Sequence, residues 1–221
     1  MNRGDISMKK LLCFMIFPLV FICSRITYLN ELYELKSYML FLGFDFLICI
    51  IMYGLTTKIL KQTYKVHDIV IFIVLGSSID QVLKLIVCKY KMNISVLGDL
   101  LQIKQTKNIN QMAALNILNI ELNTNIIVII KIFVLIVLLT LLIKNRKKKN
   151  NLVYAFLFWV MAALSNVLDS IFWGYTLDYV YFYHLTCYDL KDFYVDMAIG
   201  CFLLYFLKKE LSLKKQTNLI V

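Results

Sequence analysis

The sequence has little of what a water-soluble domain of its size contains. Only 17% of its 221 residues are charged, one is proline and seven are glycine, whereas 61% are hydrophobic and the mean hydropathy is +0.74. So few charged groups cannot cover the surface of a soluble fold, and no stretch is rich enough in proline or serine to be a long linker. We therefore expect lipid to surround most of the chain.

Motifs for metal, disulfide and nucleic-acid chemistry are also missing. The six cysteines form no CxxC pair and lie mostly in apolar runs, as small buried hydrophobes do, and no histidine stands at metal-ligand spacing. The net charge of +10 comes from basic residues between apolar runs rather than along one face, which favours topology signals over a nucleic-acid surface. The sequence thus predicts no metal, no cofactor and no nucleic-acid partner.

Six stretches are long and apolar enough, or nearly so, to cross a bilayer as helices of about 20 residues. These stretches are Leu11–Ser24, Tyr38–Leu55, Val66–Cys88, Asn125–Ile143, Leu152–Trp173 and Phe193–Leu207. The first also resembles a signal peptide, but no small-x-small cleavage site follows it, and Phe21 and Ile22 are too bulky for a lipobox before Cys23. We expect an uncleaved first span and an all-α integral membrane protein of about six transmembrane helices.

Basic residues predict the orientation of these spans. Three clusters, within residues 58–65, 144–149 and 208–215, fall on one side of the membrane if six spans are real, and Arg3, Lys9 and Lys10 fall on that side too. Cytoplasmic segments carry the excess of lysine and arginine, so both termini are expected in the cytoplasm of a bacterial plasma membrane protein. The outer loops are then about residues 25–37, 89–124 and 174–192.

Ionisable residues near or within the spans need a partner or a purpose, because a charge in the bilayer centre costs about 3 kcal/mol. Asp80 and Lys84 lie four residues apart on one helix face, where they can neutralise each other as a structural pair. Further along, four carboxylates gather at the outer membrane face, those of Asp169, Asp178, Asp189 and Asp192. Two carboxylates in a partly dry site share one proton and can act as base and acid, although a cation site is also consistent with this pattern.

In order along the chain, these stretches resemble the lipoprotein signal peptidase (signal peptidase II) family, whose pattern runs DQxxK, NxGAAF, GNxxDR, GxVVDF and FNxAD. Asp80-Gln-Val-Leu-Lys84 matches the first block. The segment from Asn110 to Leu115 matches the second, with Met112 in place of the glycine.

The later blocks match with their own departures. Residues 165–170 follow the third block around Asn166 and Asp169, with Ser165 for its glycine and Ser170 for its arginine. Residues 174–179 fit the fourth around Asp178, and residues 188–192 fit the last, with Asp189 replacing its asparagine. Asp196, one helical turn after Asp192, is an alternative register for the final aspartate.

The resemblance covers about residues 62–221 and implies a four-span bundle there with an outward-facing active site. The two-span extension expected at 1–61 falls outside the resemblance. The resemblance also implies an aspartic endopeptidase that removes the signal peptide from diacylglyceryl-modified prolipoproteins, with the dyad on Asp178 and Asp192 and sensitivity to globomycin. Lipid-modified prolipoproteins and membrane lipids are the expected partners, and we expect a monomer.

The remaining polar residues are expected to support the dyad. Asn110 is expected to bind substrate backbone or brace the dyad, Asn166 and Asp169 to orient the outer helix ends, and Asp80 with Lys84 to hold the third span in register. Asp189 belongs to the same supporting group. The departures at Met112, Ser170 and Asp189 leave one alternative, a catalytically inactive relative that binds lipidated peptides or a cation.

Overall fold

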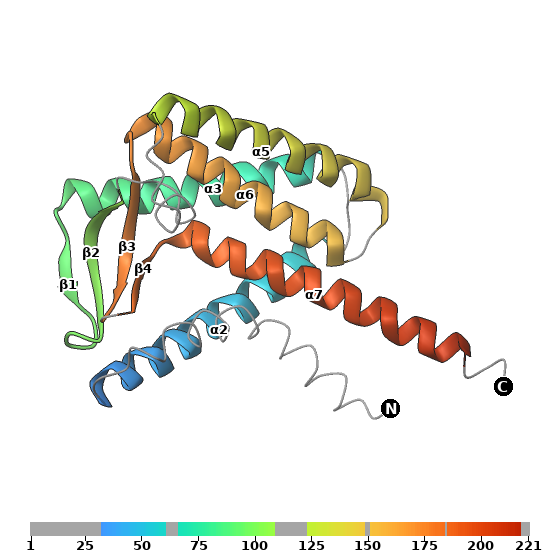
Figure 1. Cartoon of the computed structure of the whole chain (residues 1–221), viewed down its shortest axis with the longest axis horizontal. Helices are drawn as coiled ribbons and strands as arrows, with labels where there is room; N and C mark the ends of the chain where they lie inside the picture. The colour runs from blue at the N-terminus through green and yellow to red at the C-terminus, as the bar shows by residue number, and fades with distance from the viewer. Residues whose placement is uncertain (1–31, 61–65, 109–122, 149–150, 184, 218–221) are drawn as a thin grey trace.

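The computed structural model describes residues 32–60, 66–108, 123–148, 151–183 and 185–217, which form a helical bundle with a small sheet at one end (Figure 1). The helices are α2 (Leu32–Leu60), α3 (Val66–Lys89), α5 (Thr124–Asn145), α6 (Asn151–Phe172) and α7 (Leu190–Thr217), and a 3-10 turn, η2 (Arg146–Lys148), follows α5. The strands are β1 (Asn93–Ser95), β2 (Leu101–Asn108), β3 (Thr176–Phe182) and β4 (Thr186–Tyr188).

The expected helical membrane bundle is confirmed. Within the described residues, four helices are long and apolar enough to cross a membrane, over Leu35–Lys58, Val66–Lys89, Thr124–Lys148 and Asn151–Phe172. The sixth expected span, Phe193–Leu207, is helical within α7, but α7 is less apolar because charged residues stand in its first turns and again after Leu207. The first expected span, Leu11–Ser24, lies outside the described residues, and the division at residue 61 stays a prediction.

The sheet is the part of the fold that the sequence did not predict. The segments 89–124 and 174–192 contribute two strands each to an antiparallel sheet of order β1-β2-β3-β4, in which Leu101 pairs with Phe182 and Val180 with Tyr188. Short strands with mixed polar and apolar residues give a weak sequence signal, and the helical expectation covered only the spans. The sheet lies at the end of the bundle where α3 and α6 finish and α7 begins (Figure 1).

Helix α6 is the centre of the bundle, because it packs against α3, α5 and α7. Its residues from Leu152 to Met161 are almost all buried, and they form one core with residues of α3 and α7 such as Ile73 and Met197. By contrast, α5 exposes Ile129 and Phe133, each at 66%, as a lipid-facing helix does. Where α6 ends and the sheet begins, the bundle holds a group of buried charged residues that includes Asp80, Lys84 and Asp169.

Helix α2 packs mainly against α7 and the sheet, and its Tyr53 also meets Tyr154 of α6 edge-to-face, with ring centroids 6.5 Å apart. Phe41, fully buried, makes edge-to-face contacts with Phe182 and Tyr188, both with ring centroids 5.0 Å apart. These contacts form a second apolar core with Leu101 and Phe193. Helix α2 thus braces the strands that lead into the start of α7.

Candidate active site

At the sheet end of the bundle, Lys84 forms buried ion pairs with carboxylates of two helices. The Lys84 amine on α3 lies 2.7 Å from Asp80 Oδ2 one turn earlier, and 2.8 and 2.7 Å from the two carboxylate oxygens of Asp169 on α6. All three side chains are fully buried. The predicted pairing of Asp80 with Lys84 is therefore present, and it extends to a second helix.

Lys84 also reaches the segment between the sheet and α7. Its amine lies 2.7 Å from Asp189 Oδ2, and Asp189 is fully buried just before α7 begins. Gln81 adds a hydrogen bond of 2.8 Å from its amide nitrogen to Asp169, and it accepts one of 3.3 Å from the Trp173 indole. The DQxxK block thus fixes α6 and the start of α7 against α3.

The backbone after α6 brings Asp178 to this cluster. Gly174 has a φ of +70°, a left-handed conformation that glycine adopts without strain, and it turns the chain from α6 into β3. In the antiparallel register Val180 pairs with Tyr188. Extending that register by two residues places Asp178 beside Leu190, and hence near Lys191 and Asp192. The hairpin of β3 and β4 therefore brings the two ends of the segment between α6 and α7 together.

The structure brings Asp178 and Asp192 together with Asp189. One carboxylate oxygen from each of the three residues lies within 4.8 Å of the others. Asp192 Oδ2 accepts a hydrogen bond of 3.0 Å from the Asp189 backbone N–H. Asp196, the alternative to Asp192, is outside this group and neighbours Asp45 of α2 instead.

A lysine that the sequence analysis did not single out lies among these carboxylates. The Lys191 amine is 3.2 Å from Asp178 Oδ1 and 3.7 Å from Asp169 Oδ2, and it forms an ion pair with Asp189. Its side chain is 8% exposed. The available signal was the sequence Asp189-Leu-Lys-Asp192, in which a lysine stands between two carboxylates where the family's block has alanine.

Burial and charge act in opposite directions on the clustered carboxylates. Burial raises the pKa of Asp178 above its ordinary value of 3.8, although the neighbouring Lys191 partly offsets this effect. For Asp189, burial would also raise the pKa, but the charges of Lys191 and Lys84 outweigh it and hold the pKa below that value. Burial raises the pKa of Asp192 well above 3.8 as well, whereas Asp189 stays ionised.

The other residues expected to support the site lie around the cluster of Asp178, Asp189 and Asp192 or outside the described residues. The Asn166 carbonyl oxygen in the side chain is buried without a hydrogen bond among the described residues. Ser170, which stands where the family has arginine, accepts a hydrogen bond of 2.7 Å from the buried amine of Lys131 on α5. Lys131 was also missed, because a single lysine in a strongly apolar run looks incidental. Asn110 and Met112 lie outside the described residues.

The three clustered carboxylates of Asp178, Asp189 and Asp192 offer a set of oxygens that a metal ion could use. Oxygens at this spacing suit a divalent cation such as Mg²⁺ or Ca²⁺. However, the ammonium group of Lys191 already contacts two of the three carboxylates, so a cation bound there would face a like charge at close range. The chain's own lysines supply the positive charge in this cluster.

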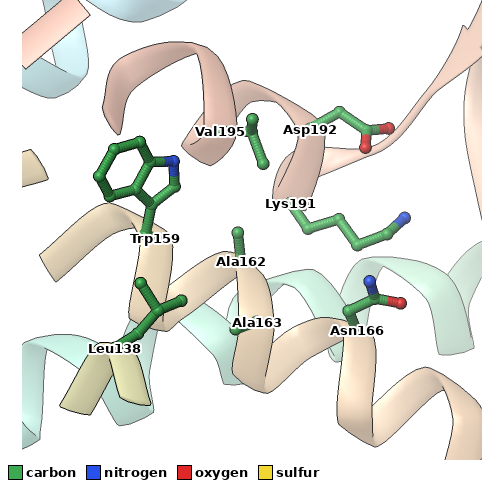
Figure 2. A pocket seen from close by; sticks show the side chains of 8 residues that line it. All are labelled: Leu138, Trp159, Ala162, Ala163, Asn166, Lys191, Asp192 and Val195. Carbon is green, nitrogen blue, oxygen red and sulfur yellow. The ribbon is translucent and has the colours of Figure 1, made fainter. Parts of the chain in front are cut away.

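An apolar cavity opens beside Asp192. It has a volume of about 290 Å³ and is lined by Leu138, Trp159, Ala162, Ala163, Asn166, Lys191, Asp192 and Val195. Figure 2 shows that Trp159 and Leu138 lie toward one end, and Asp192, Lys191 and Asn166 toward the other. The cavity therefore joins an apolar surface between α5, α6 and α7 to the polar centre.

A helical membrane bundle with clustered carboxylates beside an apolar cavity defines the chain as a multi-pass membrane protein with an acidic centre. A family model described as signal peptidase (SPase) II matches residues 72–208, and the chain belongs to this family. The match supports peptidase activity in lipoprotein processing at the level of the family.

Two solved structures, each described as a bacterial membrane enzyme determined by the in meso method, share the fold. The structure at 2.3 Å resolution is 21% identical with a TM-score of 0.57, covering 66% of this chain and 92% of that one. The structure at 1.9 Å resolution is 20% identical with a TM-score of 0.54, covering 66% of this chain and 96% of the other. A comparison with curated proteins found no match.

Proposed function

We propose that this chain is an aspartic endopeptidase that removes the signal peptide from diacylglyceryl-modified prolipoproteins, immediately before the lipid-bearing cysteine. The observation that carries the proposal is the approach of Asp178 and Asp192, whose carboxylate oxygens lie within 4.8 Å. Membership of the signal peptidase II family supports the substrate class.

A pair of carboxyl groups can hydrolyse a peptide bond when one is ionised and the other protonated. The ionised group takes a proton from water while the water oxygen bonds to the scissile carbonyl carbon, and the other group donates its proton to the carbonyl oxygen. When the C–N bond breaks, the leaving nitrogen takes the first proton and a hydroxyl of the tetrahedral intermediate returns the second. The products are a carboxylic acid and an amine, and the dyad regains its starting state.

The cavity suits a substrate that is part lipid and part peptide. Its apolar walls, including Trp159, Leu138 and Val195, can contact an acyl chain or an apolar signal segment, whereas Asp192 at its polar end can reach a peptide bond. Ala162 and Ala163 leave room along α6 that larger side chains would fill. We propose this cavity as the route by which substrate reaches the dyad from the bilayer.

The charge clusters support an orientation in which the dyad faces outward. The sheet and the dyad lie at the end of the bundle opposite η2, whose residues Arg146–Lys148 are basic. The positive-inside rule places that basic end in the cytoplasm of a plasma membrane protein, with both termini on the same side. The dyad would then meet prolipoproteins after their translocation.

The test is cleavage of a lipidated prolipoprotein by the purified full chain in detergent, followed as a mobility shift on a gel, with globomycin as the inhibition control. Wild type is expected to cleave, whereas Asp178→Asn and Asp192→Asn should each abolish cleavage while Asp196→Asn retains it. Cleavage by either dyad variant would overturn the mechanism. A wild-type protein that binds the substrate without ever cleaving it would instead favour the inactive binding module.

A further inference from the structure

Lys191 distinguishes between the two members of the proposed dyad. Its amine lies 3.2 Å from Asp178 Oδ1, and its side chain is almost fully withdrawn from the surface. Asp192 has no lysine, arginine or histidine within 4.0 Å among the residues that the structure describes, and its carboxylate accepts a neutral backbone N–H instead. The Lys191 charge acts on Asp192 as well, but only Asp178 has the amine at hydrogen-bond distance, so the two carboxyl groups differ in their direct ionic contact.

An ammonium group at hydrogen-bond distance favours the ionised form of a carboxyl group. When a close pair of carboxyls holds one proton between them, the proton goes to the member that lacks such a partner. Resting on the proposed function, we infer that Lys191 is a positioning residue that fixes the proton order of the dyad: Asp178 takes the proton from water, and Asp192 donates to the scissile carbonyl.

The groups that face Lys191 come from each element around it. Asp178 belongs to β3, Asp189 precedes α7, and Asp169 is on α6. From α3, Lys84 shares Asp169 and Asp189 with Lys191 and is itself paired with Asp80. From α5, Lys131 contacts Ser170 rather than the dyad. Of these groups, Asp178 is the only dyad member in direct contact with the Lys191 amine.

Asp189 holds Lys191 in this position. It is fully buried, and it forms ion pairs with both Lys191 and Lys84, so the lysine side chain is directed back over β3 rather than into the lipid. The family's block has asparagine and alanine where this chain has Asp189 and Lys191. These two departures from the family pattern add one negative and one positive charge, and the two charges contact each other. Two substitutions that compensate each other have this effect.

The first experiment measures the protonation of Asp178 directly in the full chain in detergent. Infrared difference spectra across a pH titration measure the intensity of the protonated carboxyl band. Subtracting the spectra of the corresponding Asp178→Asn protein leaves the part of this band that comes from Asp178. Lys191→Met should raise the midpoint of Asp178 by about 1–3 pH units, whereas Lys191→Arg should leave it within about half a unit of wild type. The matched control is Lys131→Met, another buried lysine, which should not move this midpoint.

The second experiment measures cleavage of the lipidated prolipoprotein across pH with the same variants. In Lys191→Met the acidic limb of kcat should move upward by the same 1–3 pH units, so that activity lost at neutral pH returns at higher pH, with KM little changed. A purely structural role would instead lower kcat equally at every pH. Lys191→Arg should restore the wild-type profile.

The outcomes separate this inference from the proposed function. An unchanged Asp178 midpoint in Lys191→Met, or a shifted midpoint with an unshifted acidic limb, overturns the role of Lys191. A shifted midpoint in a protein whose wild type never cleaves overturns the peptidase and upholds the electrostatic part of the inference. If Lys191→Met does not fold, the double variant Asp189→Asn with Lys191→Ala removes both charges of the pair. It should raise the Asp178 midpoint by less than Lys191→Met would, because the repulsion between Asp189 and Asp178 is lost as well.

Discussion

Lys84 on α3 and Asp169 on α6 form a fully buried ion pair in which one amine lies 2.8 and 2.7 Å from both carboxylate oxygens. The two residues are far apart in the chain, and their contact joins the first and third blocks of the family pattern. A buried charge of this kind is strongly destabilising once its partner is removed. The same ion pair therefore stabilises the bundle and holds the residues of the site in position.

The first prediction concerns this pair. Lys84→Met should lower the free energy of unfolding by about 3–5 kcal/mol, because three carboxylates lose their shared cation. Thermal unfolding in detergent, followed by circular dichroism, measures the loss. Lys89→Met, at the exposed end of the same helix, is the control and should change the unfolding temperature little. Equal unfolding temperatures for Lys84→Met and wild type would contradict the structural role.

The second prediction follows from the raised pKa of Asp178. A folded-state pKa above the ordinary 3.8 means that the folded protein binds this proton more tightly than the unfolded chain, so ionising Asp178 costs stability as pH rises through this window. Asp178→Asn should therefore be inactive but more stable than wild type at pH 7, and the difference should vanish below pH 3.8. Unfolding temperatures measured at several pH values test this, and a destabilised Asp178→Asn at pH 7 would refute it.

The third prediction has the opposite sign, because the pKa of Asp189 is lowered. A depressed folded-state pKa contributes stability above the ordinary 3.8, and this contribution is lost as pH falls through the folded-state value. Asp189→Asn should lower the stability at pH 7 by about 3 kcal/mol, since Lys191 and Lys84 each lose a partner. The same titration as for Asp178→Asn serves as the measurement. If both variants move the unfolding temperature in the same direction, the assignment of opposite shifts is wrong.

The fourth prediction concerns the cavity. Ala163→Trp should fill much of the space of about 290 Å³ beside Asp192 and reduce kcat/KM at least tenfold through a raised KM. Ile136→Trp places the same side chain on the exposed face of α5, where Ile136 is 56% exposed, and should cleave like wild type. Cleavage kinetics with a lipidated prolipoprotein distinguish the two. An unaffected KM in Ala163→Trp would mean that substrate enters by another route.

The sequence predicted the helices and the acidic residues of the site better than it predicted their contacts. Long apolar runs have one stable form in lipid, so α2, α3, α5 and α6 follow from hydropathy alone. The motif order placed Asp178 and Asp192 in one region, but their approach depends on the strand register of β3 with β4, which short mixed strands do not encode locally.

Lys191 and Lys131 show a second limit of the sequence. The aspartates of the site stand out in the sequence, but the lysines that neutralise them do not. A lysine at a helix end can equally be a topology signal, and one within a span can be a single break in an apolar run. Lys131 reaches Ser170 across two helices, a contact that only the packing of α5 on α6 creates. Buried charges have to be balanced, so an excess of aspartates at one membrane face itself predicts lysines close by.

The fifth prediction concerns the brace that α2 provides. Phe41→Ala removes edge-to-face contacts with Phe182 of β3 and Tyr188 of β4, which together stabilise the protein by about 1–3 kcal/mol. Because these two aromatic residues flank the hairpin that holds Asp178 beside Asp192, the variant should lose cleavage activity at temperatures well below global unfolding. Met39→Ala is the control, since Met39 lies on the same helix and is 65% exposed. Cleavage rates measured against temperature for both variants decide the matter: parallel curves would show that α2 is not needed to keep the hairpin in place.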